Sequence, residues 1–72
     1  MRRYAVVIGK TGTGFGAYVP DLPGCVSTGR SIEEAEQNIR AAIEFHLDGM
    51  RDDGDPIPDP TTVTVFVEIP AA

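Results

Sequence analysis

The sequence predicts an α+β domain with element order βββαβ, in which one helix covers one face of a four-stranded mixed sheet. One stretch of the 72 residues, 31–54, has helical periodicity. Three short segments rich in β-branched and aromatic residues precede it, and one such segment follows it. Neither a helix nor a sheet buries its apolar side alone, so the helix must cover the sheet. We therefore expect residues 1–72 to form a single domain.

The first three strands are predicted by their residue types and by the turns between them. We expect strands at 3–8, 15–19 and 25–28. A glycine-rich turn at 9–14 joins the first two strands, and a proline-rich turn at 20–24 precedes the third. Tight turns of this kind connect antiparallel neighbours. The three strands are therefore expected to form an antiparallel unit.

Capping signals and an apolar stripe predict the helix. Ser31 is a favourable N-cap, and Glu34 three positions later completes a capping box. Gly54 is suited to the position just after the helix, and Pro56 prevents its continuation. One face carries residues at three- and four-residue steps. They are Ile32, Ala35, Ile39, Ala42, Ile43, His46, Leu47 and Met50.

The last predicted strand is 62–69, which follows a stiff linker at 55–60. A right-handed crossover through the helix is expected to place this strand beside the first strand and parallel to it. One helix covers only one face of the sheet, so the opposite face stays without a cover. A partly apolar face of this kind usually marks an interface. Its expected members are Ala5, Val7, Tyr18 and Phe66, or the alternating set of residues if the assignment of the two faces is inverted.

Composition narrows the possible partners. The net charge is −5, which disfavours direct nucleic-acid binding and suits a basic protein partner. Cys25 is the single cysteine, so the sequence has no disulfide framework and fits a reducing cytoplasm. No apolar run is long enough to span a membrane. A chain this short buries a limited core, so we expect a homo-oligomer, a dimer or higher.

No motif in the chain predicts catalysis, a cofactor or a metal. The run 9–11 (GKT) lacks the earlier glycine and the following helix of a phosphate-binding loop. The acidic run of Asp52, Asp53, Asp55 and Asp59 lacks the ligand spacing of a calcium loop. His46 has no evident partner to position it, so we interpret it as a residue of the core or the core edge. A hydrolase using His46 and the acidic run is the least favoured hypothesis.

Several runs together resemble a known family. Residues 18–25 (YVPDLPGC) are followed by Gly29-x-Ser31-x-Glu33-Glu34-Ala35 and by Asn38-Ile39, and the linker at 54–58 fits as well. This pattern closely resembles the HicB-like antitoxin family over nearly the whole chain. The resemblance implies a partial ribonuclease-H-like βββαβ fold, in agreement with the predicted element order. Longer family members add a C-terminal DNA-binding module, so we expect this chain to be a short form without it.

The resemblance also implies a function. Antitoxins of this family bind and mask HicA-type toxins, which are small basic ribonucleases that cleave mRNA. We therefore expect a non-catalytic, cytoplasmic antitoxin that acts on such a toxin. The alternative is an orphan homo-oligomeric domain that binds a small molecule or a peptide and has no toxin partner.

The candidate residues lie on surfaces outside the contact between the helix and the sheet. These surfaces are the proline-rich turn, the uncovered sheet face, one flank of the helix and its acidic end. The residues expected to bind a partner are Tyr18, Asp21, Leu22, Phe45, Asp52, Asp53 and Phe66. The residues expected to be structural are Gly24, Ser31, Glu34, Ile39, Ile43 and His46.

Overall fold

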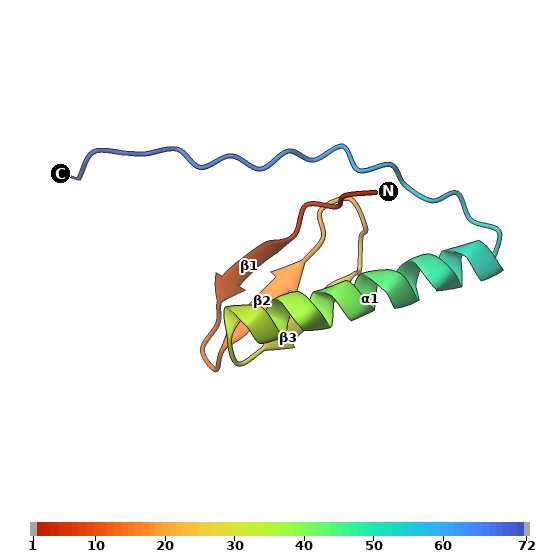
Figure 1. Ribbon diagram of the computed structural model, residues 1–72, viewed down its shortest axis with the longest axis horizontal. Coiled ribbons are helices and arrows are strands. Elements are labelled where there is room, and N and C mark those ends of the chain that lie inside the picture. Colours follow the sequence, from red (N-terminus) through yellow and green to blue (C-terminus); the bar gives the residue numbers. More distant parts are fainter. Residues whose placement is uncertain (1, 72) are drawn as a thin grey trace.

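The computed structural model describes residues 2–71, which form a three-stranded antiparallel sheet crossed by one long helix (Figure 1). The strands are β1 (Val7–Lys10), β2 (Phe15–Tyr18) and β3 (Val26–Gly29), and they lie in the order β1-β2-β3. The helix α1 spans Ile32–Asp52. The predicted antiparallel order of the first three strands is confirmed, and so is the helix that follows them.

The first strand begins later than predicted, at Val7 instead of residue 3. Val7 is paired with Tyr18, the last residue of β2, so residues 3–6 extend beyond the end of their neighbour. After Tyr18 the next backbone hydrogen bond of this segment goes to the β3 side of the sheet and not to residues 3–6. The Val19 amide donates to the Cys25 carbonyl oxygen at 3.2 Å, and Pro20 has no amide to donate. Residues 3–6 therefore have strand-like sequence without a paired strand beside them.

The predicted cap of α1 is confirmed. The Ser31 hydroxyl oxygen accepts a hydrogen bond from the Glu34 amide at 3.0 Å. The Glu34 carboxylate reaches back to the Arg30 amide at 2.9 Å, one residue before the usual capping-box partner. At the other end Gly54 has φ = +73°, a conformation that only glycine adopts without cost. Local sequence signals thus fix both ends of the helix.

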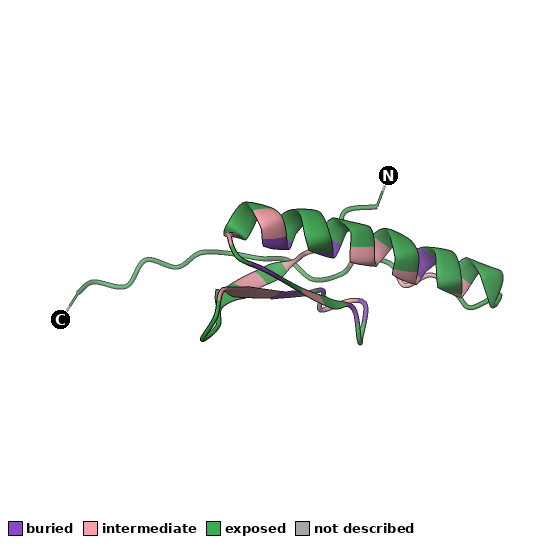
Figure 2. Cartoon of the chain, turned by 90° about the horizontal axis from the view of Figure 1, so that it is seen from below, coloured by how far each residue is buried: buried purple, intermediate pink, exposed green. Residues whose placement is uncertain are grey.

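The core lies between α1 and one face of the sheet, as Figure 2 shows from the burial of each residue. Ile43 and His46 are half-buried at its edge. Ile32 was predicted in the apolar stripe but is exposed, because it is the first residue of the helix and lies at the margin of the sheet. The buried core consists of Ala17, Val19, Leu22, Cys25, Ala35, Ile39 and Leu47.

The fourth strand was predicted at 62–69, and this prediction is wrong for the structure. After α1 the chain returns past residues 2–4 and continues as an extended C-terminal arm, residues 62–71, which makes no strand pairing among the described residues (Figure 1). The sheet therefore has three strands in place of a mixed four. A strand needs a neighbouring edge within hydrogen-bonding distance, and the arm diverges from β1 instead of lying against it.

No described helix is both long and apolar enough to cross a membrane.

Candidate partner-binding surfaces

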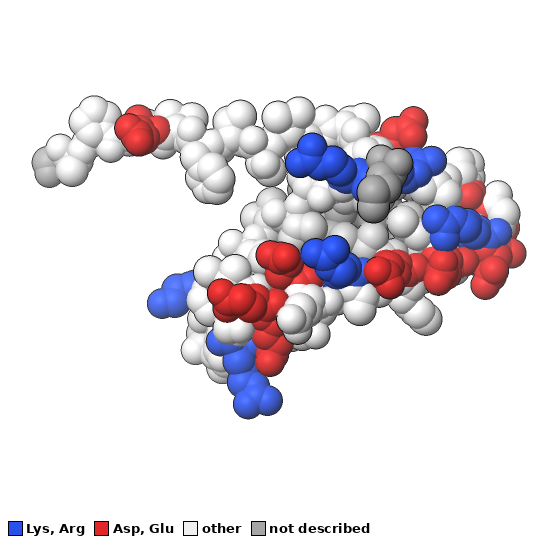
Figure 3. All heavy atoms as spheres, in the orientation of Figure 1, with Lys and Arg blue, Asp and Glu red and all other residues white. Residues whose placement is uncertain are grey.

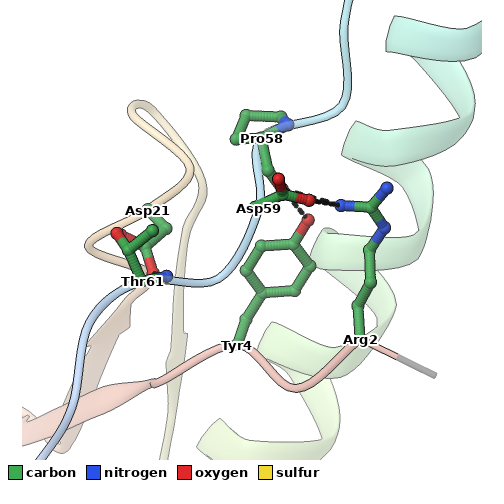
Figure 4. A network of polar contacts seen from close by, with 6 residues as sticks. All are labelled: Arg2, Tyr4, Asp21, Pro58, Asp59 and Thr61. Carbon is green, nitrogen blue, oxygen red and sulfur yellow. Dashed lines mark hydrogen bonds and ion pairs between the residues drawn. The ribbon is translucent and has the colours of Figure 1, made fainter.

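The root of the C-terminal arm is held by one carboxylate in the turn between β2 and β3 (Figure 4). Asp21 accepts four hydrogen bonds, from the amides of Thr61 and Thr62 at 3.0 Å each and from their hydroxyls at 3.2 and 2.8 Å. The Thr62 amide does most to lower the pKa of Asp21, followed by the Thr62 hydroxyl; desolvation opposes them, and the Thr61 amide and hydroxyl add smaller lowering effects. Asp21, which we expected to contact a partner, thus anchors the chain to itself.

Two side chains, Arg2 and Tyr4, hold the linker just before that root (Figure 4). The Tyr4 hydroxyl donates to the Pro58 carbonyl oxygen. The Arg2 guanidinium lies 2.9 Å from the Asp59 carboxylate and also donates to the Pro58 carbonyl oxygen at 3.2 Å. Ile57 packs against the core cluster nearby. Residues 57–62 are therefore fixed to the body of the domain, and the free part of the arm begins only after them.

One flank of α1 presents an aromatic ring among carboxylates. Phe45 is 83% exposed, the most exposed large apolar residue of α1. Helical spacing places Ala41, Asp48, Gly49 and Asp52 around it. We call these five residues the helix flank. Its small members leave the ring accessible, and its acidic members give it a negative rim.

Acidic side chains gather along the exposed side of α1 and at its C-terminal end, with arginines between them (Figure 3). Arg51 pairs with Asp48 at 2.9 Å, and Arg40 pairs with Glu36 at 3.5 Å. Asp52 and Asp53 are exposed at the end of the helix. Carboxylates at the C-terminal end of a helix interact unfavourably with the helix macrodipole, so these two residues do not stabilise the helix. Such an arrangement suits a positively charged protein surface.

The predicted uncovered sheet face is confirmed for Val7 and Tyr18, whereas Ala5 precedes β1 and Phe66 is in no strand; the face carries a continuous apolar row. Val7 is paired with Tyr18, and Tyr18 is paired with Val26, so the three side chains lie side by side across the three strands. Their exposures are 37%, 50% and 65%. They line a broad, shallow hollow of about 590 Å³. Sequence analysis missed Val26, although alternation with buried Cys25 was a signal for it.

The other predicted partner-binding residues are dispersed. Leu22 is only 1% exposed and belongs to the core, so the structure removes it from the partner surface. Phe66 lies on the C-terminal arm and is fully exposed there, away from the sheet face on which it was expected.

Within residues 2–71 no three His, Cys, Asp or Glu side chains form a group that could hold a metal ion. Burial raises the pKa of the Cys25 thiol, which keeps it protonated and unreactive at neutral pH.

Comparison with known proteins identifies a protein family that this chain resembles in sequence and fold. A family model described as HicB-like antitoxin of bacterial toxin-antitoxin system matches residues 4–71. A solved structure described as the HicA3 and HicB3 toxin-antitoxin complex contains a chain with a similar fold, with a TM-score of 0.72 and 32% identity over 83% of this chain and 70% of that one. The N-terminal domain of the Burkholderia pseudomallei antitoxin HicB aligns with a TM-score of 0.73 and 28% identity, with the same coverage.

Curated relatives match in sequence as well. A 14.9 kDa protein encoded in the rep–hol intergenic region of Haemophilus phage HP1 is 36% identical over 67 residues, which is 93% of this chain and 50% of that protein. A UPF0150 protein of Helicobacter pylori is 51% identical over 47 residues, which is 65% of each chain. The chain thus spans about half the length of the phage protein and just under two thirds of the Helicobacter protein.

Proposed function

This chain belongs to the HicB-like antitoxin family, and we propose that it binds and masks a small basic HicA-type ribonuclease that cleaves mRNA in the cytoplasm. The observation that carries the proposal is the likeness, at 32% identity, to a chain in the HicA3 and HicB3 toxin-antitoxin complex. The net charge of −5 supports it, because a ribonuclease binds the phosphates of its substrate through lysines and arginines. An acidic protein competes for the same cationic surface.

We assign toxin binding to the helix flank. Phe45 supplies a large apolar side chain that a pocket on the partner can bury, and buried aromatic residues carry much of the energy of protein interfaces. Asp48 and Asp52 form a negative rim around it, which speeds the encounter with a basic protein and fixes its orientation. The role of the protein in this proposal is steric and electrostatic, and it requires no catalytic residue.

The test requires a candidate toxin, a small basic protein from a reading frame adjacent to the one for this chain, which is co-expressed and then titrated in a calorimeter. Phe45→Ala is expected to raise Kd about 30-fold or more, since a central aromatic anchor is worth about 2 kcal/mol. Because Phe45 is exposed, the variant should melt at the wild-type temperature. Asp48→Asn combined with Asp52→Asn should slow association and weaken its dependence on salt.

Tyr18→Ala is the matched control, because it removes an exposed aromatic ring from the sheet face on the opposite side of the domain. It should leave Kd within about threefold of wild type. If Tyr18→Ala abolishes binding and Phe45→Ala does not, the sheet face binds the toxin and the assignment to the helix flank fails. If the neighbouring protein neither binds nor arrests growth, the alternative function, an orphan homo-oligomeric domain for a small molecule or peptide, replaces the antitoxin function.

A further inference from the structure

The ring of Phe45 stands open on the surface of α1. It is 83% exposed, and Ile57 packs against the core cluster instead of covering it. Its neighbours three and four positions away along the helix are small or acidic. They are Ala41, Ala42, Asp48 and Gly49. None of these side chains is large enough to shield both faces of the ring, so a partner can lie flat against it.

Gly49 leaves free space next to this ring. A Cβ added at Gly49 would meet no atom within 4 Å beyond its chain neighbours and the adjoining helix backbone. Glycine inside a helix costs stability relative to alanine, because its backbone loses more freedom on folding. Gly49 does not have the positive φ that would require glycine. Packing and backbone conformation thus leave it unexplained, whereas a ligand seated beside Phe45 would need this space.

Asp48 has one carboxylate oxygen to offer beside the ring. It lies three positions after Phe45, which places both side chains on the same side of the helix. Its Oδ1 accepts from the Arg51 guanidinium at 2.9 Å, and within residues 2–71 no donor is bonded to its Oδ2. The Asp48 side chain is 71% exposed. A surface pair this exposed is weak, so Asp48 remains able to accept a second cation.

We propose that an arginine of the partner stacks its guanidinium on the open face of Phe45 and donates to Oδ2 of Asp48. This inference rests on the proposed function, because it names the side chain with which a basic toxin meets the helix flank. A guanidinium is planar, so it lies flat on an aromatic ring while its N–H groups point outward to a carboxylate. The ammonium of lysine is a compact, strongly hydrated charge that does not combine the two contacts in this way.

The carboxylate also decides between a cation and an entirely apolar pocket on the partner. A pocket without charge that closed over Phe45 would take water away from Asp48, only one helical turn further on. A desolvated carboxylate is costly unless a cation or donors replace the lost water. A guanidinium covers the ring and pairs with the carboxylate at once. The other acidic side chains along this side of α1 (Figure 3) attract a cation as well.

The first experiment weakens the negative face of the ring in steps. Chains with one, two or five fluorine atoms on the ring at position 45 are made by chemical synthesis, checked by circular dichroism and titrated with the candidate toxin. Fluorine draws electron density from the ring, which lowers its attraction for a cation but makes it no less apolar. Kd should rise at each step and reach roughly 3–30 times the wild-type value with five fluorines.

The matched control is the same fluorine series at Phe66, whose ring is fully exposed on the C-terminal arm. It should leave Kd within about twofold of wild type. An equal rise of Kd at Phe66 and at Phe45 shows that the effect of fluorine does not come from the helix flank, and it overturns the proposal.

The second experiment asks whether one guanidinium serves both residues. Asp48→Asn is measured in the wild-type chain and in the chain with five fluorines at position 45. A shared cation couples the two changes, so Asp48→Asn should raise Kd at least about threefold less in the fluorinated chain. Asp52→Asn is the matched control, because Asp52 lies two helical turns from Phe45, and its effect should be the same in both chains.

The third experiment identifies the cation. The toxin is labelled with nitrogen-15 in its arginines only and observed by NMR. One arginine side-chain N–H signal should shift through the ring current in the complex with the wild-type chain and should keep its free position with Phe45→Ala. Arginine signals that do not respond to Phe45, or an effect of fluorine that is not coupled to Asp48, overturn the proposal.

These outcomes separate the inference from the proposed function. If Phe45→Ala weakens binding and fluorine does not, an apolar pocket encloses the ring; the arginine contact is then overturned while the antitoxin function stands. If the candidate toxin does not bind the wild-type chain at all, the proposed function and the arginine contact fail together.

Discussion

Replacement of Gly29 by alanine tests how closely α1 packs on β3. Gly29 is the last residue of β3 and is buried under the first turns of the helix. A Cβ added there would lie 2.4 Å from the Ala35 amide nitrogen, 2.8 Å from the Ala35 Cα and 2.9 Å from the Glu34 carbonyl carbon. All three are backbone atoms, so no side-chain rotation can relieve the overlap. The whole N-terminal part of α1 would have to move away from the sheet.

The size of the effect follows from that overlap. Overpacking a well-packed core costs about 1–3 kcal/mol. In a domain of this length each 1 kcal/mol lowers Tm by about 4–8 °C. Gly29→Ala should therefore lower Tm by roughly 5–20 °C in a thermal melt followed by circular dichroism, with all chains at one concentration because association also affects Tm.

Gly9→Ala is the matched control, because it makes the same substitution in a strand of the same sheet. No atom lies within 4 Å of the added Cβ. Its Tm should stay within about 3 °C of wild type, since a surface change away from special features costs little. If Gly29→Ala and Gly9→Ala melt within about 2 °C of each other, the helix does not lie against β3 at the distance described, and the reasoning is refuted.

Three further predictions concern residues whose role the fold decides. Leu22→Ala should cost about 2–5 kcal/mol of stability in a urea titration, because the side chain is buried; a loss of partner binding at unchanged stability would contradict its place in the core. Cys25 should react with Ellman's reagent at neutral pH far more slowly in the native chain than in guanidinium chloride, and equal rates would show that the thiol is accessible. Asp21→Ala should speed hydrogen exchange of the Thr61 and Thr62 amides, since both amides donate to the same oxygen of the Asp21 carboxylate and alanine offers no acceptor. The pKa of Asp21 is lowered in the folded chain, so the anchor is fully present above the ordinary value near 3.8 and is lost as the pH falls through the lower folded value. An NMR titration in which both amides keep their protection well below that range would contradict the anchor.

Parts of the candidate site could be predicted from sequence because their physical causes are local or periodic. Alternation along the second strand placed Tyr18 on the uncovered face, and pairing with Val7 follows from a short hairpin. Phe45 stood off the apolar stripe of the helix, a position compatible with a cover from Ile57 or with an interface, and only the structure shows that the ring is exposed. By contrast, Leu22 and Asp21 occur in a turn whose sequence does not say which side chain faces inward.

What the sequence by itself determined is the set of elements and their ends. Ser31, Glu34 and Gly54 define the helix through bonds and backbone conformations within a few residues of each other. Only the tertiary structure decided the fate of residues 62–69, whose strand-like pattern is as clear as that of β2. A helix satisfies its hydrogen bonds within one segment, whereas a strand depends on an edge supplied from elsewhere. Here the Asp21 anchor directs the arm away from the nearest edge of its own sheet.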